Sequence, residues 1–175
     1  MIFPPGGRGA SRRRSAGRAL YESAVRQARA PALYASLGAP DTVEGRFELL
    51  TLHVILLVER LRGEGGAAQA SSQALFDTYV GDLDGALREM GVGDLSVGKR
   101  MRELGNAFYG RAAGYRKAFE ALPEQAPLED LIGRTILQDA TGADPTALAA
   151  YAARCRDALL GMTDVLVGEP PWPAP

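Results

Sequence analysis

The chain has 175 residues, 46% of them hydrophobic, which is enough for one domain with a buried core. Its 20 basic and 21 acidic residues nearly cancel, so a strongly basic, DNA-binding character is excluded, but several arginines precede the first acid, Glu22. The single cysteine, Cys155, rules out an intrachain disulfide and favours a reducing compartment. One cysteine and one histidine also rule out a Cys/His zinc site.

Residues 1–17 consist largely of glycine, proline, serine and arginine, and this composition predicts a disordered basic leader. The segment lacks the apolar centre of a secretory signal. Its arginines and lack of acids fit either an organellar transit peptide or a bacterial leader, and we favour the bacterial leader. Such a leader is either a solvated tail or a contact for anionic lipid or RNA.

A first helix is predicted over residues 18–29, where apolar side chains recur at helical spacing. Pro31 ends or kinks it. Residues 33–37 add one turn, and Gly38-Ala39-Pro40 forms a corner, with Tyr34 as a core residue that seats it.

The central helix is predicted from Asp41 to about residue 62, and the rest of the chain is organised around it. Asp41 caps the first turn, with Glu44 completing a capping box. Residues 47–58 are almost entirely apolar, which indicates a helix buried in a domain and too short to cross a bilayer. His53 is interpreted as a hydrogen-bonded core histidine.

Three basic side chains, Arg46, His53 and Arg60, are spaced by seven along one side of this helix. Buried positive charges require carboxylate partners, although the two arginines also lie near the helix ends, where they reach solvent. The next helix, over residues 67–90, carries aspartates and glutamates beside its apolar stripe. We therefore predict that it packs antiparallel to the central helix and supplies those partners.

Residues 96–121 form a strongly amphipathic predicted helix. Its polar side carries a candidate basic surface of Lys99, Arg102, Arg116 and Lys117. Gly93, Gly98 and Lys99 have the spacing of a phosphate-binding loop, but Arg100 stands where that loop needs serine or threonine, so nucleotide binding is not expected.

Two further helices are predicted, one opening at Pro127 and one over residues 145–167 in which Cys155 is a buried apolar side chain. Residues 168–175 are rich in proline and predict a flexible tail, with Trp172 covering a groove as the alternative. No strand pattern is present. The sequence therefore predicts an all-α fold, a single compact bundle of about six helices over residues 18–167.

Several blocks of sequence occur in the order typical of the ubiquinol–cytochrome c chaperone family, and the chain resembles that family over about residues 19–122. The blocks are Tyr21, Ala28-Arg29-x-Pro31-x-x-Tyr34, Pro40-Asp41-Thr42-x-x-Gly45-Arg46-Phe47-Glu48, Leu52-His53, Leu87-Arg88-Glu89-x-Gly91-Val92-Gly93-Asp94 and Phe108-x-Gly110-Arg111-x-x-x-Tyr115.

The resemblance implies a non-catalytic assembly chaperone for ubiquinol–cytochrome c reductase, respiratory complex III, that binds newly made cytochrome b at the membrane surface. It implies a place in the bacterial cytoplasm beside the inner membrane or, alternatively, on the mitochondrial matrix face, and a small second subunit in mitochondrial members. The alternative function is a helical adaptor for the ribosome exit region or an anionic membrane surface, without a dedicated client.

The residue inventory favours a binding protein over an enzyme, because the lone histidine lies mid-helix in the most apolar segment. We expect no cofactor, no metal and no DNA partner. The candidate docking residues, taken from the matching blocks, are Pro31, Tyr34, Asp41, Arg46, Arg88, Asp94, Arg111 and Tyr115. An internal network of ion pairs and turns is the alternative role for Asp41, Arg46 and Arg88.

Overall fold

The computed structural model describes residues 7–89, 91, 94–140, 142–164, 166 and 168–175. Seven helices and no strand lie in these residues, which confirms the all-α prediction. The helices are α1 (Gly7–Ala28), α2 (Pro31–Ala35), α3 (Val43–Leu61), α4 (Gly66–Glu89), α5 (Asp94–Glu120), α6 (Ala126–Arg134) and α7 (Thr146–Leu160). The short α2 is the turn expected after Pro31.

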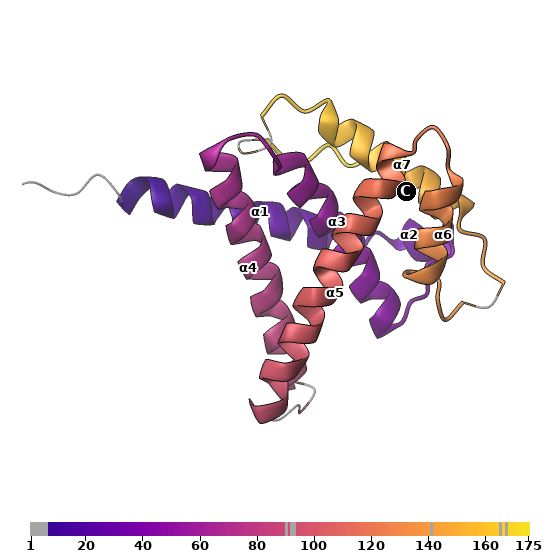
Figure 1. Cartoon of the computed structure of the whole chain (residues 1–175), viewed down its shortest axis with the longest axis horizontal. Helices are drawn as coiled ribbons and strands as arrows, with labels where there is room; N and C mark the ends of the chain where they lie inside the picture. Colours follow the sequence, from indigo (N-terminus) through magenta and orange to yellow (C-terminus); the bar gives the residue numbers. More distant parts are fainter. Residues whose placement is uncertain (1–6, 90, 92–93, 141, 165, 167) are drawn as a thin grey trace, which may run out of the picture.

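Helix α3 lies at the centre and packs against α1, α4, α5 and α7 (Figure 1). Every residue from Thr51 to Leu57 is buried, as expected for a helix that is apolar on all sides. Its N-cap differs from the prediction, because the Gly45 amide donates to the Thr42 hydroxyl (3.1 Å) rather than to Asp41. Within the described ranges, no helix has both the length and the apolar character needed to cross a bilayer.

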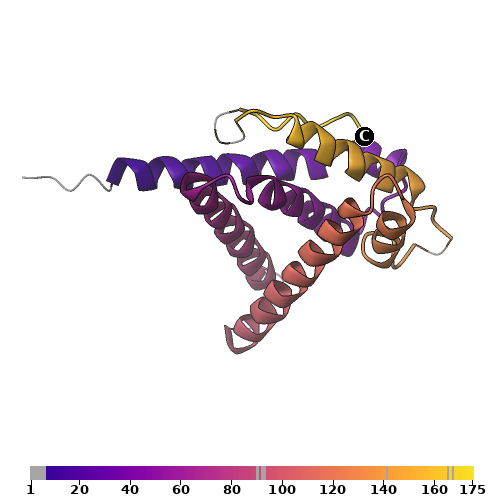
Figure 2. The same ribbon diagram turned by 45° about the horizontal axis from the view of Figure 1, so that its top comes forward.

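Helix α1 crosses α4 at very short range. A Cβ atom on Gly17 would lie 2.6 Å from the Ala74 Cβ and 2.7 Å from the Leu75 amide nitrogen, so only glycine fits this crossing. The helix begins at Gly7, whereas the sequence placed its start near Arg18 and a disordered leader before it. Alanine and arginine favour helix, which allows α1 to continue past the body at its N-terminal end (Figures 1 and 2).

Helices α4 and α5 converge on a shared tip that projects from the rest of the molecule (Figure 2). An aromatic cluster joins them, with ring centroids of Phe76 and Phe108 4.9 Å apart and those of Tyr79 and Phe108 5.5 Å apart. The ring of Tyr109 extends this cluster to the surface, where it is 63% exposed.

Helix α4 packs beside α3 as predicted, but it does not supply the predicted ion pairs. Asp77 accepts a hydrogen bond from Gln73 (2.7 Å) and Asp84 accepts one from Arg88 (2.8 Å). Both partners lie four residues away on α4 itself, the closest polar neighbours that a helix surface offers. The prediction that α4 carboxylates neutralise Arg46, His53 and Arg60 is therefore wrong.

Helix α7 ends at Leu160 instead of residue 167, and the chain returns to lie along α1 and α7. The flexible tail predicted from residue 168 is instead held at defined contacts. The indole Nε1 of Trp172 donates to the Ser23 hydroxyl (3.0 Å), and its ring meets His53 edge-on at 5.2 Å. An indole has an apolar face and one polar donor, and both find partners here.

Candidate functional site

The structure brings four of the predicted docking residues to one open pocket of about 610 Å³ at the α2–α3 corner, lined by Pro31, Tyr34, Asp41 and Arg46 together with Arg29 and Ala35. Pro31 begins α2, and the chain then turns back into α3. A Cβ atom on Gly45 would lie 2.1 Å from the Pro40 carbonyl oxygen, so glycine allows the corner to close against the first turn of α3.

Two polar contacts shape this corner pocket, an ion pair and a tyrosine hydrogen bond. Arg46 Nε donates to the Asp41 carboxylate (2.5 Å), and this hydrogen bond lowers the pKa of Asp41. Both side chains remain largely exposed, at 64% and 58%, so the pair stabilises the fold little and stays accessible to a partner. The Tyr34 hydroxyl donates to the Ala28 carbonyl (2.7 Å), which fixes the ring, and burial raises its pKa.

Of the other predicted docking residues, Arg88, Arg111 and Tyr115 do not line the corner pocket. Arg88 pairs with Asp84 on α4, and Asp94 is the first residue of α5, with a side chain outside the described part of the structure. Tyr115 is 1% exposed, and its hydroxyl lies 3.4 Å from that of Thr135. Burial raises the Tyr115 pKa.

Arg111 joins α5 to α3 through a two-pronged contact with Glu48. Its Nε donates to one carboxylate oxygen (2.7 Å) and its Nη2 to the other. The Glu48 side chain is 10% exposed and that of Arg111 24%, so this pair is shielded from water. In this structure, Arg111 and Tyr115 hold helices together.

The predicted basic surface divides into two parts. Lys99, Arg102 and Lys117 are exposed on α5, with Lys99 Nζ 4.0 Å from Glu103. Arg116 instead makes a bidentate contact with Glu59 of α3, through hydrogen bonds of 2.9 and 2.8 Å. It belongs to a pocket that the sequence analysis did not identify.

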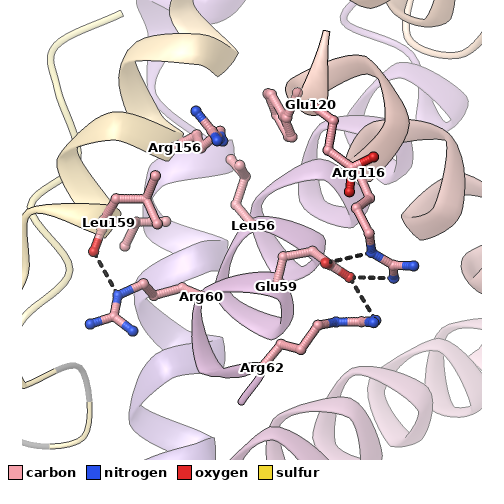
Figure 3. A pocket seen from close by; sticks show the side chains of 10 residues that line it. Leu56, Glu59, Arg60, Arg62, Arg116, Glu120, Arg156 and Leu159 are labelled. Carbon is pink, nitrogen blue, oxygen red and sulfur yellow. Dashed lines mark hydrogen bonds and ion pairs between the residues drawn. The ribbon is translucent and has the colours of Figure 1, made fainter. Parts of the chain in front are cut away.

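This second pocket has a volume of about 280 Å³ and lies where the C-terminal parts of α3, α5 and α7 meet (Figure 3). Leu56, Phe119 and Leu159 form an apolar lining, and four arginines surround it: Arg60, Arg62, Arg116 and Arg156. No local motif signals the pocket, because its lining comes from three helices that are distant in the chain.

The arginines of the second pocket have different partners. Glu59 accepts hydrogen bonds from Arg116 and from Arg62 (3.1 Å), as the dashed lines in Figure 3 show. Arg60 donates to the carbonyls of Leu159 (2.8 Å) and Met162 (2.6 Å) at the end of α7. Arg60 Nη1 also pairs with Glu64 (2.6 Å), in the loop directly after α3, so its acidic partner comes from that loop and not from α4.

His53 is fully buried, which confirms its interpretation as a core histidine. Its Nδ1 lies 2.7 Å from the Leu49 carbonyl oxygen, which can only accept, so Nδ1 carries the proton. Its Nε2 then accepts from the Tyr151 hydroxyl (2.8 Å), which in turn accepts from Gln27 Nε2 (2.8 Å). Burial lowers the His53 pKa to about 4. Both nitrogens are engaged, so the ring is not placed to act as a base.

Cys155 is also buried, as predicted, and burial raises its thiol pKa to about 12. Among the described residues, His, Cys, Asp and Glu side chains form no group of three or more suited to bind a metal ion. The described surface also contains several open pockets, at helix ends and along helix sides. These features define an all-helical protein with open surface pockets between its helices.

The family model described as ubiquinol-cytochrome C chaperone matches residues 35–172. A solved structure, the Cbp3 homolog from Brucella abortus, is 37% identical, with a TM-score of 0.80 over 90% of this chain and 87% of that chain. No curated protein compared with the sequence matches it. The chain belongs to the ubiquinol–cytochrome c chaperone family. The family match confirms the resemblance seen in the sequence and extends it past residue 122, to Trp172.

Proposed function

We propose that the protein is a non-catalytic assembly chaperone for respiratory complex III, and that its client is newly made cytochrome b. The observation that carries this proposal is the family match over residues 35–172, supported by a fold shared with the Cbp3 homolog along most of both chains. The engaged, buried imidazole of His53 supports holding a client over transforming it. We place this work in the bacterial cytoplasm, at the inner membrane surface.

The corner pocket is the docking surface that we assign to the client. It combines a fixed aromatic ring, Tyr34, with an accessible pair of opposite charges, Asp41 and Arg46. Rigid aromatic side chains are common at the centres of protein interfaces. Exposed charged groups, which need little desolvation, are common at their rims.

A deletion strain tests the function. We expect loss of assembled complex III and a shorter lifetime of cytochrome b, both restored by the wild-type gene. Normal levels of complex III and stable cytochrome b in the deletion strain would refute the chaperone role.

A charge exchange tests the docking surface. The variants are Asp41→Arg, Arg46→Asp and the double exchange, which keeps an ion pair but reverses its direction. We expect each single variant and the double exchange to fail in complementation, because the client contacts each charged group at its own position. Rescue by the double exchange would show that the pair acts only within the fold.

The matched control is the exposed pair Asp130–Arg134 on α6, with nitrogen and oxygen 2.9 Å apart and side-chain exposures of 66% for Arg134 and 65% for Asp130. Its exchange should complement fully. Affinity purification from the same strains adds a second readout. Recovery of cytochrome b supports the chaperone, whereas recovery of ribosomes or anionic vesicles without cytochrome b favours the adaptor. A small protein recovered in equal amount would be the second subunit.

A further inference from the structure

Residues 169–175 lie against α1 and α7 without forming a helix or strand of their own. Pro170 is buried and Trp172 is partly buried, although both belong to an extended, proline-rich segment. Trp172 is the single tryptophan of the chain, and its ring packs edge-on against the fully buried His53. The segment therefore covers the polar centre of the helical body.

The first half of the segment is held by one cluster on α1. The Ser23 hydroxyl donates to the Glu169 carboxylate (2.7 Å) while accepting from the Trp172 indole (3.0 Å). Arg26 donates to the same carboxylate (2.5 Å). These hydrogen bonds lower the Glu169 pKa, the one from Ser23 most strongly. Ser23 therefore binds both the Glu169 carboxylate and the Trp172 indole, which are three residues apart in the chain.

The second half is held through its backbone carbonyls. Gln27 Nε2 donates to the Pro173 carbonyl (3.2 Å) and to the Tyr151 hydroxyl (2.8 Å), which donates to His53. Arg154 of α7 reaches the Ala174 carbonyl (3.5 Å). Prolines lack an amide hydrogen, so side-chain donors on the body match a segment that presents mainly acceptors.

These contacts resemble the recognition of a peptide. An extended proline-rich segment is stiff before it binds, so little conformational entropy is lost when an aromatic-lined surface receives it. The indole acts as the anchor, with an apolar ring against His53 and one directed hydrogen bond. Helix α7 ends at Leu160, and residues 169–175 belong to no helix that the structure describes, so the segment can leave without unwinding one.

We propose that Ser23, Gln27, His53 and Tyr151 form a binding site for an extended acidic proline–tryptophan segment, and that residues 169–175 of this chain occupy the site as an exchangeable intramolecular ligand. The site lies on α1, α3 and α7, apart from the corner pocket, and does not depend on complex III being the target. When the segment leaves, the surface over His53 becomes available to a segment of the same chemistry.

A peptide with the sequence of residues 169–175 tests the site in trans. Its tryptophan is replaced by 5-fluorotryptophan, so that ¹⁹F NMR reports binding to any variant of the full chain. We expect saturable binding to the full-length Trp172→Ala variant, whose own anchor is missing, and little binding to wild type, whose site is filled. Adding Ser23→Ala should weaken binding by at least roughly fivefold, because the hydrogen bonds from the indole and to the Glu169 carboxylate are both lost.

A second variant keeps the test valid if Trp172→Ala does not fold. Glu169→Lys places a cation beside Arg26 while leaving the anchor in place. We expect Trp172 fluorescence in this variant to become more accessible to acrylamide, and the fluorinated peptide to bind more tightly than to wild type. Asp130→Lys, an equal charge change on α6, is the matched control and should behave as wild type.

Two results would overturn the proposal. One is the absence of saturable peptide binding to a folded Trp172→Ala or Glu169→Lys chain. The other is equal binding to wild type and variants, which would place the peptide elsewhere. A wild-type dimer that forms at high concentration and disappears in Trp172→Ala would support the site, because the tail of a second copy then fills it.

Discussion

Buried neutral His53 should make the protein lose stability as the pH falls below about 6.5. In the folded chain its Nδ1 donates to the Leu49 carbonyl and its Nε2 accepts from Tyr151. Burial opposes a charge on the ring and lowers its pKa from 6.5 to about 4. The unfolded chain therefore binds a proton between these two pH values while the folded chain does not.

The sign and the size follow from this linkage. Above about pH 6.5 both states are neutral, and the full stability is present. As the pH falls, protonation favours the unfolded chain by about 2 kcal/mol at pH 5 and about 3 kcal/mol at pH 4. The loss levels off below the folded pKa of about 4, where the folded state binds the proton as well.

Urea denaturation of wild type and His53→Gln, followed by circular dichroism from pH 7.5 to 4, measures this effect. The variant cannot titrate at this position and should be less stable at neutral pH, because it loses packing against Tyr151 and Trp172. Carboxylates titrate alike in both proteins, so the difference between the two pH profiles isolates His53. The difference in unfolding free energy between wild type and variant should shrink by about 3 kcal/mol between pH 7.5 and pH 4. Parallel profiles would refute the reasoning.

Three further experiments test the packing. Gly17→Ala should destabilise by about 1–3 kcal/mol in urea denaturation, because α1 and α4 must separate, whereas Gly81→Ala, which meets nothing within 4 Å, should be neutral or stabilising. Glu48→Gln should cost about 3 kcal/mol by the same assay, because Arg111 loses its shielded partner; a cost below about 1 kcal/mol would mean that water replaces it. Cys155 should react with a thiol reagent only at the rate of chain opening, and rapid modification of folded protein would contradict its burial.

Local patterns in the sequence predicted much of the architecture. The apolar run of residues 47–58 identified the central helix, and the same pattern identified His53 as a core residue. The corner residues Pro31, Tyr34, Asp41 and Arg46 were found from the family blocks, and the structure places them at one pocket. The sequence analysis did less well at segment ends. It missed the extension of α1 to Gly7, and it missed the docked tail, which depends on contacts with α1 and α3.

What the sequence by itself determined is the set of helices, their apolar faces and the family, because helical periodicity is a property of consecutive residues. Which side chains meet was decided only by the tertiary structure. Arg60 was expected to pair with acids of α4, and it pairs with Glu64 instead. Its guanidinium also binds the carbonyls of Leu159 and Met162, and Trp172 binds Ser23 and His53. These partners lie about a hundred residues or more away along the chain, and only the crossing of helices brings such groups within hydrogen-bonding distance.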